Sequence, residues 1–278
     1  MKRLLSIELQ KIWLNKASRI LTLSYFILLS FIALIASIKY DLGPIKLHFA
    51  EMGIFNFPYI WHFNTYIADF FKFFLAIIIV SMMANEYSYG TLKQNLIDGM
   101  SKKEFITSKF LTVVVFALAS TIFVFLMSLI LGLSFSSYTE ASILFSKMDY
   151  LLAYFVKLLG FFTFCLFIGI LIKRSAFAIG FVFIWYVIEA IIVGLIKYNF
   201  FKDSKLAAAL TNYLPLQSMS NLIVEPISKL SVIKNVSTQI GIDQVKDYSV
   251  HYLTILTVCF WIVLFIYWSL QILKKRDL

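Results

Sequence analysis

The side chains that most often perform catalysis or bind metals are few in this sequence and widely separated. His48, His62 and His251 stand far apart, and none belongs to an H-E-x-x-H pair, the helical spacing of a hydrolytic zinc site. Cys165 and Cys259 lie in apolar runs without metal-ligand spacing. No G-x-S-x-G turn is present to expose a nucleophilic serine. The sequence therefore predicts no catalytic residue and no metal site, so an enzyme is not expected.

A nucleotide-binding loop is not recognisable either. None of the ten glycines opens a G-x-x-x-x-G-K-[ST] phosphate cradle, and no dinucleotide fingerprint occurs. We therefore expect no cofactor in this chain, and any activity driven by a nucleotide would need a separate subunit to bind it.

Four ionisable residues stand inside long apolar stretches: Asp69, Lys72, Lys157 and Glu189. An Asp or Lys at the centre of a membrane helix costs about 2.5 to 3.5 kcal/mol, so such residues usually face a bundle interior or a water-filled cavity. Asp69 and Lys72 are three residues apart, share one helix face and could neutralise each other. For Glu189 two interpretations stay open, a functional polar site and a structural hydrogen bond to a neighbouring helix.

The composition indicates which elements must position these residues. Of the 278 residues, 61% are hydrophobic and 14% are charged, whereas soluble domains carry about 45–50% apolar and about 25% charged residues. One water-soluble core cannot hide this excess, so lipid must solvate much of the chain. The net charge of +10 lies at the ends of the apolar runs. That distribution favours membrane orientation over nucleic-acid binding.

Six stretches have the roughly 20 apolar residues that a membrane-crossing helix needs. They are Ile20–Ile38, Phe63–Ala84, Ser108–Leu133, Tyr150–Ile172, Ala176–Ile196 and Val250–Leu273. The sequence thus predicts an all-α, polytopic bundle in a single transmembrane domain over residues 1–278. A signal peptide is the alternative for the first stretch, but its length favours a retained anchor. Lys and Arg are more numerous on the side that holds both termini. This distribution predicts a cell-membrane protein whose termini lie on the cytoplasmic side.

Two segments outside the spans also carry patterns. In residues 1–19, Leu5, Leu9, Ile12 and Trp13 recur at helical spacing, which predicts an amphipathic helix lying in the membrane interface. The alternative is that these residues extend the first span. Residues 197–249 form an extracytoplasmic segment too long for a plain connector, and its short apolar pieces, broken by proline, predict one or two short helices.

The cytoplasmic loop over residues 85–107 is the most informative segment. Thr91 with Gln94, and Ser101 with Glu104, have the spacing of capping boxes. Gly99 stands where a left-handed helix cap is expected. The loop therefore predicts a short helix over residues 91–98, a sharp turn and a new helix that becomes the third span.

This loop resembles the one between the second and third spans in permease subunits of ATP-binding-cassette exporters of the second type. The positions that carry the resemblance are Glu86, Gly90, Thr91, Lys93, Leu96, Gly99, Ser101, Lys102, Glu104 and Lys109. The wider layout of an elbow helix, six spans and a long outer segment is also similar. The resemblance implies that the loop is a coupling helix docking on an ATPase, with two permease chains on two ATPase chains. ATP and magnesium would then bind to the ATPase.

The resemblance further implies that the second and fifth spans line the substrate route. The residues it assigns there are Tyr66, Asp69, Phe70, Phe73, Phe181, Trp185 and Glu189. Such an aromatic wall would suit an amphipathic or lipid-like substrate. The alternative for each aromatic residue is contact with membrane lipids or packing between helices. The rival function for the chain is a membrane scaffold, sensor or channel without an ATPase partner.

Overall fold

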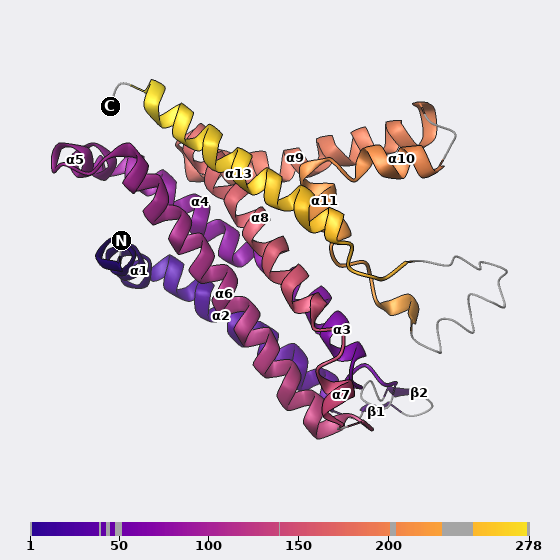
Figure 1. The fold of residues 1–278 in the computed structure, drawn as a ribbon. Helices are drawn as coiled ribbons and strands as arrows, with labels where there is room; N and C mark the ends of the chain where they lie inside the picture. Colours follow the sequence, from indigo (N-terminus) through magenta and orange to yellow (C-terminus); the bar gives the residue numbers. More distant parts are fainter. Residues whose placement is uncertain are drawn as a thin grey trace.

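A computed structural model describes residues 2–38, 40–42, 45–47, 52–138, 140–200, 204–229 and 247–276. Long helices run side by side through the molecule (Figure 1). The first helices are α1 (Lys2–Leu14), α2 (Lys16–Ser37), α3 (Tyr59–Asp69) and α4 (Lys72–Ser88), followed by α5 (Thr91–Ile97), α6 (Lys102–Phe135) and α7 (Ala141–Leu144). The remaining long helices are α8 (Asp149–Ile172), α9 (Ser175–Leu195) and α13 (Tyr252–Lys275).

The spans agree with the sequence prediction. Five helices, α2, α6, α8, α9 and α13, are long and apolar enough to cross a membrane, and the number is six when the bent pair α3–α4 is counted as one span. The fold is therefore all-α and that of a polytopic membrane protein. The strand structure in the described residues is a ribbon of two antiparallel three-residue strands, β1 (Tyr40–Leu42) and β2 (Ile45–Leu47).

The second span is broken, whereas the sequence predicts one continuous helix over Phe63–Ala84. Helices α3 and α4 meet at a bend of 46°. The amides of Phe70 and Phe71 bond to carbonyls three residues back, Ile67 and Ala68, so the helix tightens and ends there. The broken ends place Asp69 and Lys72 on either side of the bend, where a charged pair inside the bundle replaces an uninterrupted apolar stretch.

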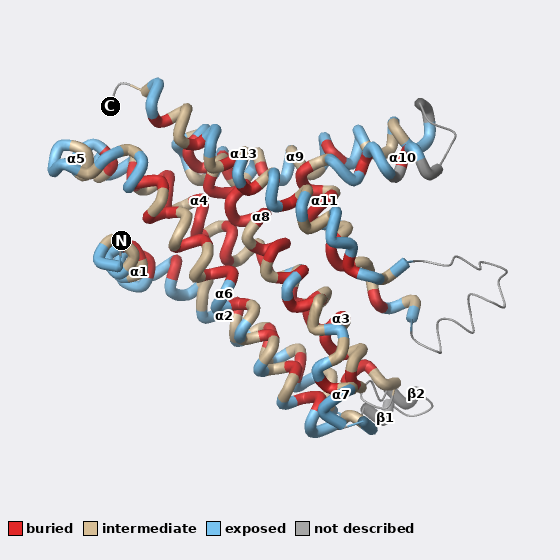
Figure 2. The backbone as a smooth tube through the Cα atoms, viewed as in Figure 1, coloured by how far each residue is buried: buried red, intermediate tan, exposed pale blue. Residues whose placement is uncertain are grey.

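Helix α8 forms the centre of the bundle and α9 its periphery. Most of α8 is buried, and it packs against α4, α6, α9 and α13, while most of α9 is exposed (Figure 2). Apart from single charged residues such as Lys157 and Glu189, both helices carry apolar side chains on all sides. A helix of that kind is stable only when it is surrounded by protein or by lipid, so the exposed apolar side chains of α9 require a lipid or protein neighbour.

Helix α1 is a separate element and does not extend the first span. Asn15 lies between α1 and α2, and its side-chain oxygen accepts a hydrogen bond from the amide of Ser18 at 3.1 Å. An asparagine in this role satisfies an orphan amide at the start of the next helix. The chain therefore turns a corner at Asn15, as an elbow helix requires.

The described part of residues 197–249 contains two short α-helices, in agreement with the prediction of one or two. They are α10 (Ser204–Thr211) and α11 (Pro215–Asn221), and a five-residue π-helix over Ile196–Phe200 and a 3₁₀ turn over Ile227–Lys229 accompany them. Residues 201–203 and 230–246 of this segment lie outside the described residues. Helix α11 packs among α8, α9 and α13, so this part of the segment is built into the bundle. His62 bonds to the carbonyl of Val224 at 2.6 Å, which ties the segment to α3.

Candidate functional site

The loop between α4 and α6 folds as a short helix with defined ends. Gly90 precedes α5 with a φ of 67°, and Gly99 follows it with a φ of 96°. The amide of Met100 bonds to the carbonyl of Asn95 at 3.0 Å, and that of Gly99 to Leu96 at 3.2 Å. This is the Schellman pattern, which needs a left-handed residue where Gly99 stands. The predicted short helix and its glycine cap are confirmed.

One of the two predicted capping boxes is present and the other is not. Ser101 caps α6, with the amide of Glu104 bonding to its hydroxyl and the Glu104 carboxylate bonding back to the Ser101 amide. The prediction for Thr91 and Gln94 is wrong. Gly90 is the residue that precedes α5, so Thr91 already lies inside the helix, and its hydroxyl donates to Glu86 at 2.5 Å. Gln94 bonds instead to Asp98.

Helix α5 has a packed face and a bare face. Leu92 is buried and Leu96 packs partly against the core. Lys93 and Asp98 are exposed, and the side chain of Ile97 is 69% exposed. In Figure 1, α5 projects at the end of the bundle where both chain termini lie. An apolar side chain flanked by charges on a projecting, well-capped helix is suited to a protein contact.

A buried ion network ties this loop to the elbow helix. The ammonium of Lys109 lies 2.6 Å from a carboxylate oxygen of Glu8 and 2.6 Å from one of Glu86. Lys11 adds a contact of 3.0 Å to the same Glu86 oxygen. The side chain of Lys109 is completely buried, and Glu86 is 3% exposed. Glu86 is therefore an internal link between α1, α4, α5 and α6, and it does not present its carboxylate to solvent.

The electrostatics of the network are balanced. Two carboxylates, Glu8 and Glu86, face two ammonium groups, Lys11 and Lys109. Burial lowers the pKa of Lys11, but the carboxylates of Glu8 and Glu86 outweigh it and hold that pKa above its usual value. The sequence analysis did not identify Glu8 and Lys11 as members of a buried network. The available signal was a carboxylate on α1 beside an apolar stripe, because such a charge needs a buried partner if the stripe packs on the bundle.

The same end of the molecule is tied together by side chains that bond to helix carbonyls. Lys102 donates to the carbonyl of Lys274 at 3.3 Å and to that of Arg276 at 3.1 Å. Arg276 in turn donates to the Tyr87 hydroxyl at 2.7 Å and to the Ile170 carbonyl at 2.6 Å. Cations at helix C-termini satisfy orphan carbonyls and complement the helix dipole. Lys102, one of the predicted coupling residues, thus anchors α6 to α13.

A second charged group lies inside the bundle at the bend of the second span. Lys72 lies 2.9 Å from the Asp69 carboxylate, as its spacing predicts, and Lys157 of α8 lies 3.1 Å from the same oxygen. The ammonium of Lys72 also sits 4.8 Å from the centre of the Phe161 ring. Two cations thus share one carboxylate, and the ring face supplies part of the remaining compensation.

Glu189 is occupied by a structural contact. Its carboxylate accepts from the amide of Gln217 at 2.5 Å and from the indole of Trp185 at 3.1 Å. Gln217 lies in the first turn of α11, where amides have no partner within the helix. The hydrogen-bond interpretation of Glu189 therefore describes this residue, and Trp185 orients it.

The aromatic residues predicted for the pathway form separate ring pairs. Tyr66 and Phe70 pair on α3 and its end, with ring centres 5.2 Å apart. Phe73 packs with Phe183 at 5.2 Å, and Phe181 with Trp185 at 5.9 Å. The space left between α4 and α9 near Phe73 amounts to about 10 Å³. The described side chains of α4 and α9 therefore pack closely against one another near Phe73.

Comparisons with known proteins place the chain in a family. The chain belongs to the family described as "Protein of unknown function (DUF2705)", whose model matches residues 27–278. A stretch of 79 residues is 34% identical to "Uncharacterized protein YhcI" of Bacillus subtilis (strain 168), covering 27% of this chain and 25% of that protein. The chain thus matches about a quarter of the length of this relative.

Proposed function

We propose that this member of the family is the membrane-spanning permease subunit of an ATP-binding-cassette exporter of the second type. The observation that carries the proposal is the geometry of α5. It is a rigidly capped helix with an exposed apolar residue, Ile97, and its first residue is bonded to the buried ion network through Glu86. A push on α5 would therefore pass directly to α1, α4 and α6.

The ATPase is proposed as a separate partner, because the sequence contains no phosphate cradle. Two ATPase copies would bind ATP and magnesium, and each would bind α5 of one of two permease chains. In this arrangement Lys93 and Ile97 contact the ATPase. Glu86, Gly90, Thr91 and Gly99 hold α5 in place, and Leu96, Ser101, Lys102 and Glu104 pack or cap the adjoining helices. Nucleotide-driven closure moves the loop, and the coupling is mechanical since the two sites lie on different chains.

A second permease chain, identical or related, is proposed to cover α9. A Cβ placed on Gly180 or Gly194 of that helix would meet nothing within 4 Å, so another helix has room to approach closely there. Together with the exposed Phe70, the α9 surface would form one wall of a route between two chains for an amphipathic or lipid-like substrate. Both termini and α5 would lie on the cytoplasmic side of the cell membrane.

Replacement of Ile97 by Asp tests the docking role. A tagged chain is purified from its native membrane in mild detergent, and co-purifying chains that carry a G-x-x-x-x-G-K-[ST] loop are quantified by mass spectrometry. The wild type is expected to retain such an ATPase. Ile97→Asp should reduce the retained amount about tenfold, since loss of a central apolar contact costs more than about 1 kcal/mol.

The matched control is Tyr138→Asp, which changes an exposed aromatic residue beyond the far end of α6. It should leave the ATPase bound. Retention of the ATPase by Ile97→Asp at the wild-type level would exclude α5 as the docking element. Absence of any ATPase from the wild-type preparation would favour the rival class, a membrane scaffold, sensor or channel.

A further inference from the structure

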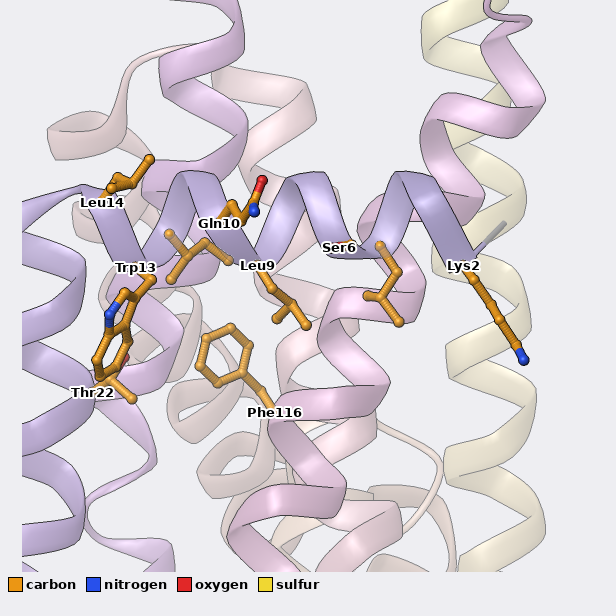
Figure 3. A pocket seen from close by; sticks show the side chains of 10 residues that line it. Lys2, Ser6, Leu9, Gln10, Trp13, Leu14, Thr22 and Phe116 are labelled. Carbon is orange, nitrogen blue, oxygen red and sulfur yellow. The ribbon is translucent and has the colours of Figure 1, made fainter.

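A large groove runs along the elbow helix, beside the spans against which that helix packs. Its volume is about 870 Å³, and it runs along α1 between that helix and the sides of α2 and α6. Figure 3 shows Leu9 and Trp13 of α1 pointing into it from one side, with Phe116 of α6 reaching up and Thr22 of α2 at one end. This volume is within the range of pockets that hold small-molecule ligands, about 300 to 1,000 Å³.

The walls of the groove are mainly apolar, and no described part of the chain covers them. One face of α1 packs against the bundle at the ion network, where Glu8 and Ile12 are buried. Trp13 points into the groove and remains 52% exposed, and Leu9 is only partly buried. The groove lies on the side of α1 that faces the spans. If α1 lies in the membrane interface, the groove therefore opens toward the acyl chains of the lipids.

The charge at the other end of the groove is positive. Lys2 lines the groove in its first turn, and Arg3 stands next to it, exposed. Neither forms an ion pair within the described residues. Glu8, the acidic residue of α1, is paired with Lys109. A basic residue at the interface, next to an apolar slot, is complementary to a phosphate that carries an acyl chain.

We propose that this groove binds one anionic glycerophospholipid, with an acyl chain between Leu9 and Phe116 and the phosphate at Lys2. Trp13, at the end of the groove away from Lys2, would lie against the acyl chain. The bound lipid completes the contact between the elbow helix and the bundle. The site is independent of the proposed function, because it requires only that the chain is embedded in a bilayer.

The test measures lipid retained by the full-length chain. The protein is delipidated in detergent and titrated with phosphatidylglycerol or phosphatidylcholine, and bound lipid per chain is counted by native mass spectrometry. The wild type should bind phosphatidylglycerol more tightly than phosphatidylcholine. Lys2→Gln should weaken phosphatidylglycerol binding about fivefold, the effect of one basic residue near an anionic lipid. Ser6→Trp, which fills the groove from an exposed position, should weaken both lipids.

Lys16→Gln is the matched control, since Lys16 is exposed on α2 and does not line the groove. It should bind phosphatidylglycerol as the wild type does. Equal binding by the wild type, Lys2→Gln and Ser6→Trp would overturn the site. A photoreactive benzoylphenylalanine in place of Leu9 identifies the occupant directly. A lipid adduct is the expected product, whereas a cross-linked dimer would show that a second copy of the chain fills the groove and would overturn the proposal.

Discussion

Lys109 joins elements that are far apart in the chain by being buried between two carboxylates. Its ammonium has no exposure and contacts Glu8 and Glu86, which come from α1 and α4. The desolvation cost of such a charge is offset only while its partners remain. Single residues in this protein therefore matter through the pairing that they complete, and removing one partner leaves the others buried and unmatched.

Lys109→Met is expected to destabilise the chain by about 3 to 5 kcal/mol, because Glu8 and Glu86 keep their burial and lose their main counter-ion. The measurement is the unfolding midpoint of the purified protein in detergent. Lys103→Met, on the same helix but exposed, should change stability by less than about 0.5 kcal/mol. Equal effects of the two replacements would mean that the network adds nothing to stability.

Replacing different members of the charged group Asp69, Lys72 and Lys157 should have unequal effects on folding. Lys157→Met leaves Asp69 and Lys72 as a neutral pair, whereas Asp69→Asn leaves two buried ammonium groups without a carboxylate. Asp69→Asn should therefore lower the amount of folded protein in the membrane much more strongly than Lys157→Met. The double variant Asp69→Asn with Lys157→Met should recover part of the loss. A larger effect of Lys157→Met than of Asp69→Asn would contradict this assignment of charges.

At the scale of elements, the short helices are held by side chains from the long ones. Helix α11 is seven residues long and could not stand alone in water. It is held by burial of Leu216 and Met219 and by the bond from the Gln217 amide to Glu189. Helix α5 is held in the same way by Leu92 and by the bond from Thr91 to Glu86. A helix of this length takes its stability from tertiary contacts.

Glu189→Leu should loosen α11, since its first-turn amides lose their acceptor while the side-chain volume stays similar. The readout is hydrogen exchange of the α11 amides followed by mass spectrometry, where exchange should become faster across Pro215–Asn221. Trp185→Phe removes the indole bond but keeps the Gln217 contact, so its effect should be smaller. Unchanged α11 exchange in Glu189→Leu would show that burial alone holds the helix.

At the scale of the whole molecule, the two ends of the bundle differ. One end gathers α1, α5, both termini and the bonds of Lys102 and Arg276 to helix carbonyls (Figure 1). The other carries α7 and the β1–β2 ribbon (Figure 1). Basic residues concentrate at the first end, so the charge rule predicts that this end faces the cytoplasm.

Cysteine labelling tests this orientation. In a chain with the exposed Cys259 replaced by serine, Lys93→Cys on α5 should react with a membrane-impermeant maleimide only after the cells are opened. Ser137→Cys, beyond the other end of α6, should react in intact cells. Reaction of Lys93→Cys in intact cells would invert the topology and remove α5 from the reach of a cytosolic ATPase.

The positions of the apolar helices, apart from the bend in the second span, were predictable from the sequence, as were the separate elbow helix, the capped turn at Gly99 and the Ser101–Glu104 box. Each depends on residues close together in the chain, whose hydropathy or hydrogen bonding selects the local structure. The ends of α8 and α9 were predictable because Lys173 and Arg174 interrupt two apolar runs. The pairing of Asp69 with Lys72 was predictable for the same reason, since helical geometry fixes neighbours three residues apart.

Which distant groups meet depends on how the helices pack together. Lys109 and Glu8 are separated by 101 positions, and Glu189 and Gln217 by 28. The bend in the second span, the addition of Lys157 to Asp69 and the groove under α1 likewise depend on how the helices pack. Periodicity tells which face of a helix is apolar, but the partner of a buried charge is chosen by the arrangement of all the helices, because the cost of burial is offset only where opposite charges come within a few ångströms.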